Sequence, residues 1–152
     1  RMQVEGVGVF GYSREPGTVG GTMEAAPALA VPAEIKTRRR DEIMALQQKV
    51  AFARNQAMAA KFEAGGEPKA MRVEVLIDAA LRTQGKKTSG RLYQGRTKFQ
   101  APQLDGVTFV HSRAPLSPGE LVSCVVVDAD GYDLIARPIG DGEKKVGLKV
   151  IG

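Results

Sequence analysis

The most continuously apolar run of the chain is LVSCVVVDAD at residues 121–130. Turn-forming residues bound this run, because Pro118-Gly119 precedes it and Asp130-Gly131 closes it. An Asp-Gly dipeptide favours a tight type I′ hairpin turn. The three consecutive valines inside the run are β-branched and suit a pleated surface better than a helix. The pattern predicts a long central strand that enters a hairpin. A two-stranded hairpin is marginally stable in water, so we expect further strands to pack with it.

Apolar and polar residues also alternate with a period of two in several short stretches from Met71 onward, as they do in half-buried strands. The stretches that we expect to form strands are residues 71–79, 91–96, 106–111, 121–129 and 132–137. Five short antiparallel strands so closely spaced predict a small OB-like barrel at residues 67–140. Residues 141–152 are assigned as a tail, although their alternation leaves an additional frayed strand open.

Residues 32–66 show a helical period instead. Pro32 suits the first turn of a helix, and Gly65 and Pro68 suit its end. Apolar residues recur at spacings of three and four on one narrow stripe. The members of the stripe are Ile43, Leu46, Val50, Ala53, Ala57 and Ala60. We expect a long linking helix whose stripe packs tightly against another surface.

Residues 1–31 precede this helix and contain two different patterns. Residues 1–13 resemble the last strand of an upstream domain, and the segment from Arg14 to Val31 is expected to be an irregular connector because it contains Pro16-Gly17 and Pro27. Since the chain begins inside a strand-like run, we expect it to be the C-terminal part of a longer protein. The predicted fold class is therefore α+β.

Composition excludes several kinds of site. Charged residues make up 26% of the 152 residues, which is ordinary for a globular protein. The only cysteine, Cys124, excludes an internal disulfide framework and a cluster held by several thiolates. We expect this thiol to be buried and structural. The only histidine is His111, so no metal site and no catalytic residue are expected. Without a long apolar run or a signal segment, the sequence predicts a cytoplasmic protein with no membrane partner.

Charge is unevenly distributed along the chain, whose net charge is +5. Residues 63–98 hold eight basic and four acidic residues, whereas residues 99–143 hold two basic and seven acidic residues. This division could orient a charged partner, or it could be an ordinary solvated surface. Tyr93 lies within the basic part, and Phe99 follows directly after it. Aromatic residues interleaved with basic ones can stack against RNA bases while the basic side chains bind phosphates.

Several motifs resemble one known family. Residues 10–18, FGYSREPGT, resemble the FxYSxExGT signature near the end of the radical-SAM domain of bacterial methylthiotransferases, and residues 38–48 resemble the helix that follows it. Four further blocks resemble the family's C-terminal TRAM domain. They are Gly95-Arg96-Thr97, Ala101–Val107, Pro118-Gly119-Glu120 and Tyr132-Asp133-Leu134. The resemblance runs from about Val7 to Arg137.

Two branches of the family compete. The tRNA-modifying MiaB type usually has an arginine where this chain has Glu15, and it lacks the Ala-Pro-x-Leu/Ile-Asp-Gly block that residues 101–106 resemble. Both features favour the RimO type, which methylthiolates the β-carbon of an aspartate in a small-subunit ribosomal protein. The alternatives are a fragment of the tRNA-modifying type and a free-standing OB-like RNA-binding module with a helical arm.

The resemblance also implies cofactors, partners and site residues. The whole protein would use two 4Fe–4S clusters and S-adenosylmethionine, none of them bound by this chain, which would be inactive alone. Partners would be the ribosomal protein or ribosome and the upstream radical-SAM domain. The charge of the basic loop 82–91 leaves RNA open as a further partner. Tyr12 and Ser13 would close that domain near the S-adenosylmethionine site. The charge pattern, and not the resemblance, gives the candidate substrate-binding residues Arg91, Arg96, Phe99, Asp105, Asp128, Asp130 and Asp133. Asp130 and Asp133 flank the expected hairpin tip, where we expect their side chains to project into solvent, and an acidic surface there would steer a basic ribosomal protein.

Overall fold

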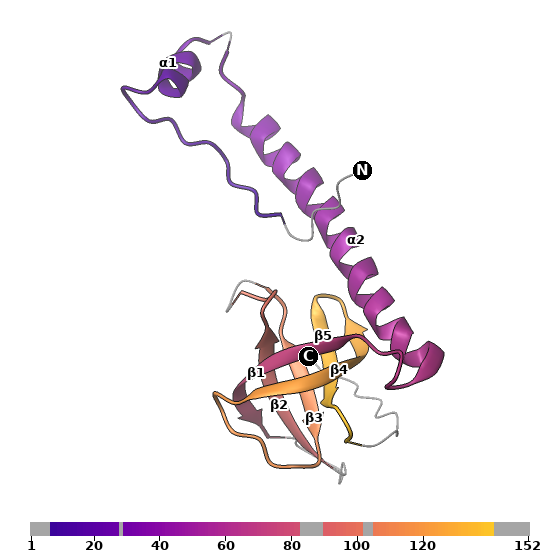
Figure 1. Ribbon diagram of the computed structural model, residues 1–152. Coiled ribbons are helices and arrows are strands. Elements are labelled where there is room, and N and C mark those ends of the chain that lie inside the picture. The colour runs from indigo at the N-terminus through magenta and orange to yellow at the C-terminus, as the bar shows by residue number, and fades with distance from the viewer. Residues whose placement is uncertain (1–6, 28, 83–89, 102–104, 142–152) are drawn as a thin grey trace. The chain divides into compact units, whose positions relative to one another are not determined.

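The computed structural model describes residues 7–27, 29–82, 90–101 and 105–141. Two compact units divide the chain, residues 1–51 and residues 52–152, and each is described by itself. The elements are the helices α1 (Val19–Ala25) and α2 (Ala33–Gly65) and the strands β1 (Arg72–Leu81), β2 (Arg91–Thr97), β3 (Thr108–Ser112), β4 (Leu121–Asp130) and β5 (Asp133–Pro138) (Figure 1). In the part of the chain that is described, no helix combines the length and the apolar character needed to cross a membrane.

The five strands close into a barrel in the order β1-β2-β3-β5-β4, so the predicted barrel is confirmed. One detail of the prediction was wrong, because β3 and β5 run parallel, with Thr108 beside Leu134 and Val110 beside Ala136. The reason is topological. Strand directions cannot alternate all the way around a closed ring with an odd number of members. A five-stranded closed barrel therefore needs at least one parallel pair.

The β4–β5 hairpin lies one residue later than the sequence predicts. Asp130 pairs with Asp133, so Gly131 and Tyr132, and not Asp130-Gly131, occupy the centre of the turn. Gly131 has a φ of 59°, a left-handed conformation that glycine adopts without steric cost. A bulge between Val126 and Asp128 shifts the register of β4 against β5. The bulge changes which residues of β4 face outward near the turn.

Alternate side chains of the strands fill the barrel. The buried cluster comprises Val75, Ile77, Tyr93, Val110, Cys124 and Ala136. The Tyr93 hydroxyl accepts a hydrogen bond from the Leu116 backbone N–H at 2.9 Å, so the polar end of this buried ring is satisfied. Burial, together with the negative charge of Asp141, raises the pKa of the Cys124 thiol to about 12. Cys124 is thus the buried thiol that its place in the strand pattern predicts.

The C-terminal part of α2 covers the barrel with a face that the sequence analysis did not identify. Ala59 and Phe62 are buried, Phe52 meets Tyr132 edge-to-face at 4.9 Å between ring centroids, and Asn55 Nδ2 donates to the Gly131 carbonyl at 3.0 Å. These four helix residues are spaced by three, four and three, which places them on one side of the helix. The face was overlooked because it contains a polar residue, Asn55.

The predicted apolar stripe lies on the opposite side of α2 and is exposed. Leu46, for example, retains 64% of its accessible surface, and Ala53, Ala57 and Ala60 are also exposed. The expectation that this stripe packs against another surface is therefore wrong within the chain as described. Apolar residues on two opposed faces give the helix no single amphipathic direction.

Residues 1–51 contain two further differences from the sequence analysis. Residues 7–13 form no strand, and α1 lies inside the segment that was expected to be irregular. Thr18 begins α1, because its Oγ1 accepts a hydrogen bond from the Gly21 N–H at 3.0 Å and donates one to the Glu15 carbonyl at 2.9 Å. A Cβ atom on Gly21 would lie 2.0 Å from that carbonyl oxygen. The Glu-Pro-Gly-Thr part of the FGYSREPGT motif is thus a helix-capping turn.

Candidate functional site

The predicted acidic residues gather near one end of the barrel, where β4 turns into β5. Asp133 Oδ1 accepts a hydrogen bond from the Val107 N–H at 2.8 Å and is only partly exposed, so the expectation that it projects freely into solvent was wrong. Its carboxylate ties the start of β5 to the segment before β3. This role follows from the register, since Val107 precedes the residue that pairs with Leu134.

Three acidic side chains of the set remain exposed, namely those of Asp105, Asp128 and Asp130. Asp105 Oδ2 accepts from the Ala101 N–H at 2.7 Å, and Asp128 Oδ1 accepts from the neighbouring Ala129 N–H at 2.8 Å. These hydrogen bonds shape local turns and leave each carboxylate with further lone pairs for a partner. The barrel end therefore carries accessible negative charge.

The predicted basic residues do not form one site. Arg91 pairs with Ser112 at the far end of β3, whereas Gly95 pairs with Thr108 at its beginning, so Arg91 lies at the other end of the barrel from the acidic residues. Its Nη1 donates to the Arg113 carbonyl at 3.2 Å. Residues 83–89 of the basic loop lie outside the described residues.

Arg96 already has a carboxylate partner. Its Nη1 lies 2.7 Å from Asp78 Oδ1, and both side chains retain about a third of their accessible surface, 35% and 31%. Asp78 is the residue skipped by the register shift in the pairing of β1 with β2. The bulge turns this carboxylate toward the neighbouring strand, so Arg96 is part of the barrel wall and has only a limited capacity for another anion.

Phe99 is the predicted site residue with the most distinctive surroundings. It follows β2 and keeps 56% of its accessible surface. Two cations approach its ring, because Lys98 Nζ lies 5.0 Å and Arg54 Cζ lies 5.7 Å from the ring centroid. Sequence reasoning did not include Arg54 in the candidate site. No local signal could have found it, since α2 brings it to Phe99 only through tertiary packing.

The turn that carries Phe99 is held by a partly buried hydrogen-bond network. Gln100 Oε1 accepts from the Thr97 N–H at 2.9 Å and from the Thr108 hydroxyl at 2.7 Å. The Gln100 N–H donates to the Thr97 carbonyl at 3.1 Å, and Thr97 and Thr108 are both buried. Phe99 is therefore presented to solvent by a well-supported turn.

Tyr12 and Ser13 lie in the other unit and are both exposed. Lys36 Nζ lies 5.7 Å from the Tyr12 ring centroid, and the same Lys36 forms an ion pair with Glu24 of α1. A Cβ atom on Gly20 would approach the Tyr12 hydroxyl to 3.0 Å. Tyr12 thus packs locally against α1 and the start of α2. Its suggested place near an S-adenosylmethionine site remains a proposal.

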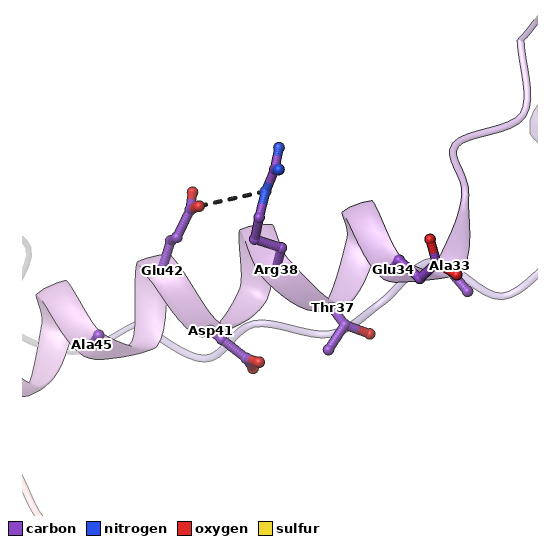
Figure 2. A pocket seen from close by; sticks show the side chains of 7 residues that line it. All are labelled: Ala33, Glu34, Thr37, Arg38, Asp41, Glu42 and Ala45. Atoms are coloured by element: carbon purple, nitrogen blue, oxygen red, sulfur yellow. Dashed lines mark ion pairs between the residues drawn. The ribbon is translucent and has the colours of Figure 1, made fainter.

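A shallow hollow of about 770 Å³ follows one face of α2 (Figure 2). The residues that line it all lie between Ala33 and Ala45, and they include the ion pair between Arg38 Nε and Glu42 Oε1 at 3.6 Å. All of these residues belong to a single helix, so the hollow has no opposing wall among its lining residues. It offers no convergent set of polar groups for a ligand.

The donor atoms of the chain do not fit an iron–sulfur cluster. Within the described residues, no group of three or more His, Cys, Asp or Glu side chains is placed to hold a metal ion. A 4Fe–4S cluster is held by cysteine thiolates, and the sequence contains a single cysteine. That cysteine is buried with a raised pKa, which opposes formation of the thiolate that ligates iron.

Comparisons with known proteins match this geometry. Residues 71–139, which contain all five strands completely, match the TRAM domain family. The chain is 38% identical over 138 residues to the ribosomal protein uS12 methylthiotransferase RimO of Anaeromyxobacter sp. (strain K), an alignment that covers 91% of this chain and 25% of that protein.

Proteins of the same name from two other bacteria give similar values. Identity is 37% over 142 residues for Pseudomonas putida (strain W619), with 90% of this chain and 26% of that protein covered. It is 33% over 135 residues for Lachnoclostridium phytofermentans, with 89% and 26% covered. The chain therefore spans about a quarter of the length of these relatives. Residues 71–139 are a TRAM domain, and the chain is homologous to the C-terminal part of the ribosomal protein uS12 methylthiotransferases.

Proposed function

We propose that this chain is the substrate-docking, C-terminal part of an enzyme that methylthiolates the β-carbon of an aspartate in ribosomal protein uS12. The observation that carries the proposal is the 38% identity over 91% of the chain to a uS12 methylthiotransferase. Such an enzyme would act in the cytoplasm, where its ribosomal substrate is found. None of the residues in this chain is assigned to the chemical step.

The cofactors of the complete enzyme would be two 4Fe–4S clusters and S-adenosylmethionine, which supply the radical chemistry and the sulfur transfer. The donor set of this chain does not fit a cluster, because its one cysteine is a buried thiol. We therefore assign both clusters to other parts of the enzyme. The chain's contribution would be binding and orientation of the substrate, which can supply a large share of catalytic acceleration when the geometry is right.

The exposed stripe of α2 supports a second part of the proposal, docking against the upstream radical-SAM domain. Ile43, Leu46 and Val50 retain 45%, 64% and 41% of their accessible surface. Three large apolar side chains on one helix face are an unusual feature to leave exposed and typically mark an interaction surface. Tyr12 and Ser13 would then lie at the junction with that domain, on the side of the S-adenosylmethionine site.

The acidic end of the barrel supports docking of uS12. Asp105, Asp128 and Asp130 are exposed there, and ribosomal proteins are usually basic. Complementary charge would steer the substrate toward this surface and would fix its orientation. Because the residues are exposed, their attraction should weaken as the salt concentration rises.

The test is a modification assay on the complete protein that contains this chain. The protein, with its clusters reconstituted, is incubated without oxygen with S-adenosylmethionine, a sulfide source, a one-electron reductant such as dithionite, and either purified uS12 or tRNA, and the products are analysed by mass spectrometry. The proposal predicts one methylthio group on one aspartate of uS12. Modification of tRNA and not of uS12 would instead indicate the tRNA-modifying type. If neither substrate is modified, the free-standing RNA-binding module becomes the better explanation.

A further inference from the structure

The tip of the β4–β5 hairpin is the part of the barrel with the least support from neighbouring strands. β1 pairs with β4 from Leu121 to Val125, and β3 pairs with β5 from Leu134 to Ala136. Within the described strands, residues 128–133 at the tip therefore pair only with each other. A two-stranded segment is marginally stable in water, so the tip needs support from outside the sheet.

The helix α2 supplies this support through Asn55. Asn55 Nδ2 donates to the Gly131 carbonyl at 3.0 Å and to the Tyr132 carbonyl at 3.2 Å. Because both partners are acceptors, only the NH2 group of the side chain can make both hydrogen bonds, and it has two hydrogens to donate. Gly131 and Tyr132 are the two central residues of the turn. A single neutral side chain therefore holds both of their carbonyl groups.

Two further contacts fix the same turn. The Phe52 ring, one helical turn before Asn55, meets Tyr132 edge-to-face at 4.9 Å between centroids, and a Cβ atom on Gly131 would lie 3.2 Å from Phe52 Cζ. The segment before β3 also approaches closely, since a Cβ atom on Gly106 would lie 2.3 Å from the Tyr132 carbonyl oxygen. The turn is thus contacted both by α2 and by the segment that leads into β3.

The exposed carboxylates of the acidic barrel end are carried by the segments that meet at this turn. Asp128 and Asp130 lie at the end of β4, and Asp105 immediately precedes Gly106. A shift of the turn would move Asp130 directly and would move Asp105 through the contact of Gly106 with Tyr132. A binding surface that is fixed in advance loses less conformational freedom when a partner binds, so a larger part of the contact energy appears as affinity.

We propose that Asn55 is a positioning residue for substrate docking, because it holds the β4–β5 turn so that Asp105 and Asp130 are fixed where a basic segment of the protein substrate binds. This inference rests on the proposed docking of uS12 at the acidic barrel end. It adds a neutral residue that acts through the turn. Loss of such docking weakens binding of the substrate and of the transition state equally, so it raises KM and leaves kcat unchanged.

The experiment measures KM and kcat for uS12 in the modification assay with the complete protein. Asn55→Ala should raise KM by about threefold to tenfold and should leave kcat within about twofold. The matched control is Gln56→Ala, which removes the neighbouring, exposed amide and should change neither constant. A merely structural role of Asn55 would lower the amount of folded enzyme, and so the apparent kcat, without raising KM.

A second pair of variants separates geometry from charge. Asn55→Asp keeps the size of the side chain, but a carboxylate cannot donate to the carbonyls of Gly131 and Tyr132. Added negative charge alone would attract a basic substrate and lower KM, whereas loss of positioning raises it. We expect a higher KM for Asn55→Asp. Gln56→Asp, which adds the same charge one residue away, should leave KM unchanged or slightly lower.

Hydrogen–deuterium exchange of the complete protein measures the hold on the turn without any substrate. The Val107 N–H donates to Asp133 Oδ1 at 2.8 Å, and the Leu134 N–H donates to the Val107 carbonyl at 2.9 Å. If Asn55 fixes the turn, Asn55→Ala should speed exchange at these two amides by about threefold or more relative to Gln56→Ala, because local opening becomes easier. Equal exchange in the two variants would show that Asn55 does not fix the turn, and the inference would be wrong.

The kinetic outcomes distinguish this inference from the proposed function. The double variant Asp128→Lys with Asp130→Lys tests docking at the acidic end itself, and a wild-type KM for it would contradict that docking. If it raises KM while Asn55→Ala behaves like Gln56→Ala, the acidic end docks the substrate and Asn55 does not position it. A lower KM for Asn55→Asp would also overturn the inference, because charge and not geometry would then decide binding.

Discussion

Arg137 Nη2 lies 3.2 Å from Glu67 Oε2 across the junction between β5 and the segment that follows α2. Only 8% of the Arg137 side chain and 20% of the Glu67 side chain remain accessible, and the guanidinium also lies 5.0 Å from the ring centroid of Phe62. Glu67 Oε1 accepts a hydrogen bond from the Gly140 N–H at 2.9 Å. The carboxylate thus links the segment after α2 to the C-terminal end of β5 and to Gly140 just beyond it, and its removal leaves a buried cation without its counter-charge.

We therefore expect Glu67→Ala to destabilise the chain by about 3 kcal/mol or more, because a buried guanidinium without a carboxylate is costly. The double variant Glu67→Leu with Arg137→Met should be more stable than Glu67→Ala, since it removes both charges and keeps the side-chain volume. Urea unfolding monitored by circular dichroism measures both. A double variant that is less stable than Glu67→Ala would contradict this explanation. It would show that the ion pair contributes more to stability than the neutralisation of two buried charges.

The two faces of α2 should respond differently to substitution. Phe62 is buried at 6% exposure, whereas Leu46 is exposed at 64%. In the isolated chain, Phe62→Ala should cost ~3–5 kcal/mol, and Leu46→Asp should change stability by less than about 0.5 kcal/mol.

In the complete protein, Leu46→Asp should become strongly destabilising, because it would place an unpaired charge in the proposed interface with the upstream domain. Thermal unfolding of the isolated chain and of the complete protein makes the comparison. An unchanged melting temperature of the complete protein carrying Leu46→Asp would refute docking through this stripe.

The buried thiol predicts a stability change at alkaline pH. The pKa of Cys124 is raised from 9.0 to about 12, so above pH 9 the unfolded chain releases the thiol proton while the folded chain keeps it. The contribution of this group to stability is present below pH 9 and is lost as pH rises toward 12. Between these values we expect Cys124 to lower the free energy of unfolding by roughly 1 kcal/mol per pH unit.

Comparison with Cys124→Ala isolates this effect, because the variant lacks the titrating group. The difference in unfolding free energy between the two proteins should narrow from pH 8 to pH 10.5. A difference that stays constant would mean that Cys124 titrates near its ordinary value in the folded chain.

Gly95 should tolerate no side chain, although it lies in a strand. A Cβ atom there would lie 2.5 Å from the Leu76 carbonyl oxygen and 2.7 Å from Val75 Cγ1, so β1 and β2 would have to separate. We expect Gly95→Ala to cost ~1–3 kcal/mol through overpacking. Gly119→Ala is a useful contrast, because nothing lies within 4 Å of the added atom and its cost arises only from its φ of 86°. A smaller loss for Gly95→Ala than for Gly119→Ala would contradict this explanation.

Local patterns were sufficient for much of the fold. The period-two stretches located all five strands, and Pro32 and Gly65 marked the ends of α2 to within one residue. Strand pairing was harder to predict from local patterns. The parallel β3–β5 pair follows from closure of the ring and not from the sequence of either strand. The packing face of α2 was missed because it contains the polar residue Asn55. The side-chain amide of Asn55 nevertheless contacts the β4–β5 turn, since it donates hydrogen bonds to the backbone carbonyls of Gly131 and Tyr132.

The candidate site was predictable only in part. Phe99 was identified from an aromatic residue next to basic ones, a purely local pattern. Arg54 reaches the Phe99 ring across a long separation in sequence, which no local pattern encodes. Asp133 was misjudged for the same reason, since its carboxylate is used by Val107 N–H of another segment.

The central claim, that the acidic barrel end docks uS12, is tested most directly by the affinity of the chain for purified uS12. The charge-reversed variant carries Asp128→Lys and Asp130→Lys, both at exposed positions, and leaves Asp133 in place because it holds Val107. We predict weaker binding than wild type at low salt, a difference that shrinks as salt rises, and an unchanged melting temperature. Equal affinity of the variant and the wild type for uS12 at low salt would contradict the claim.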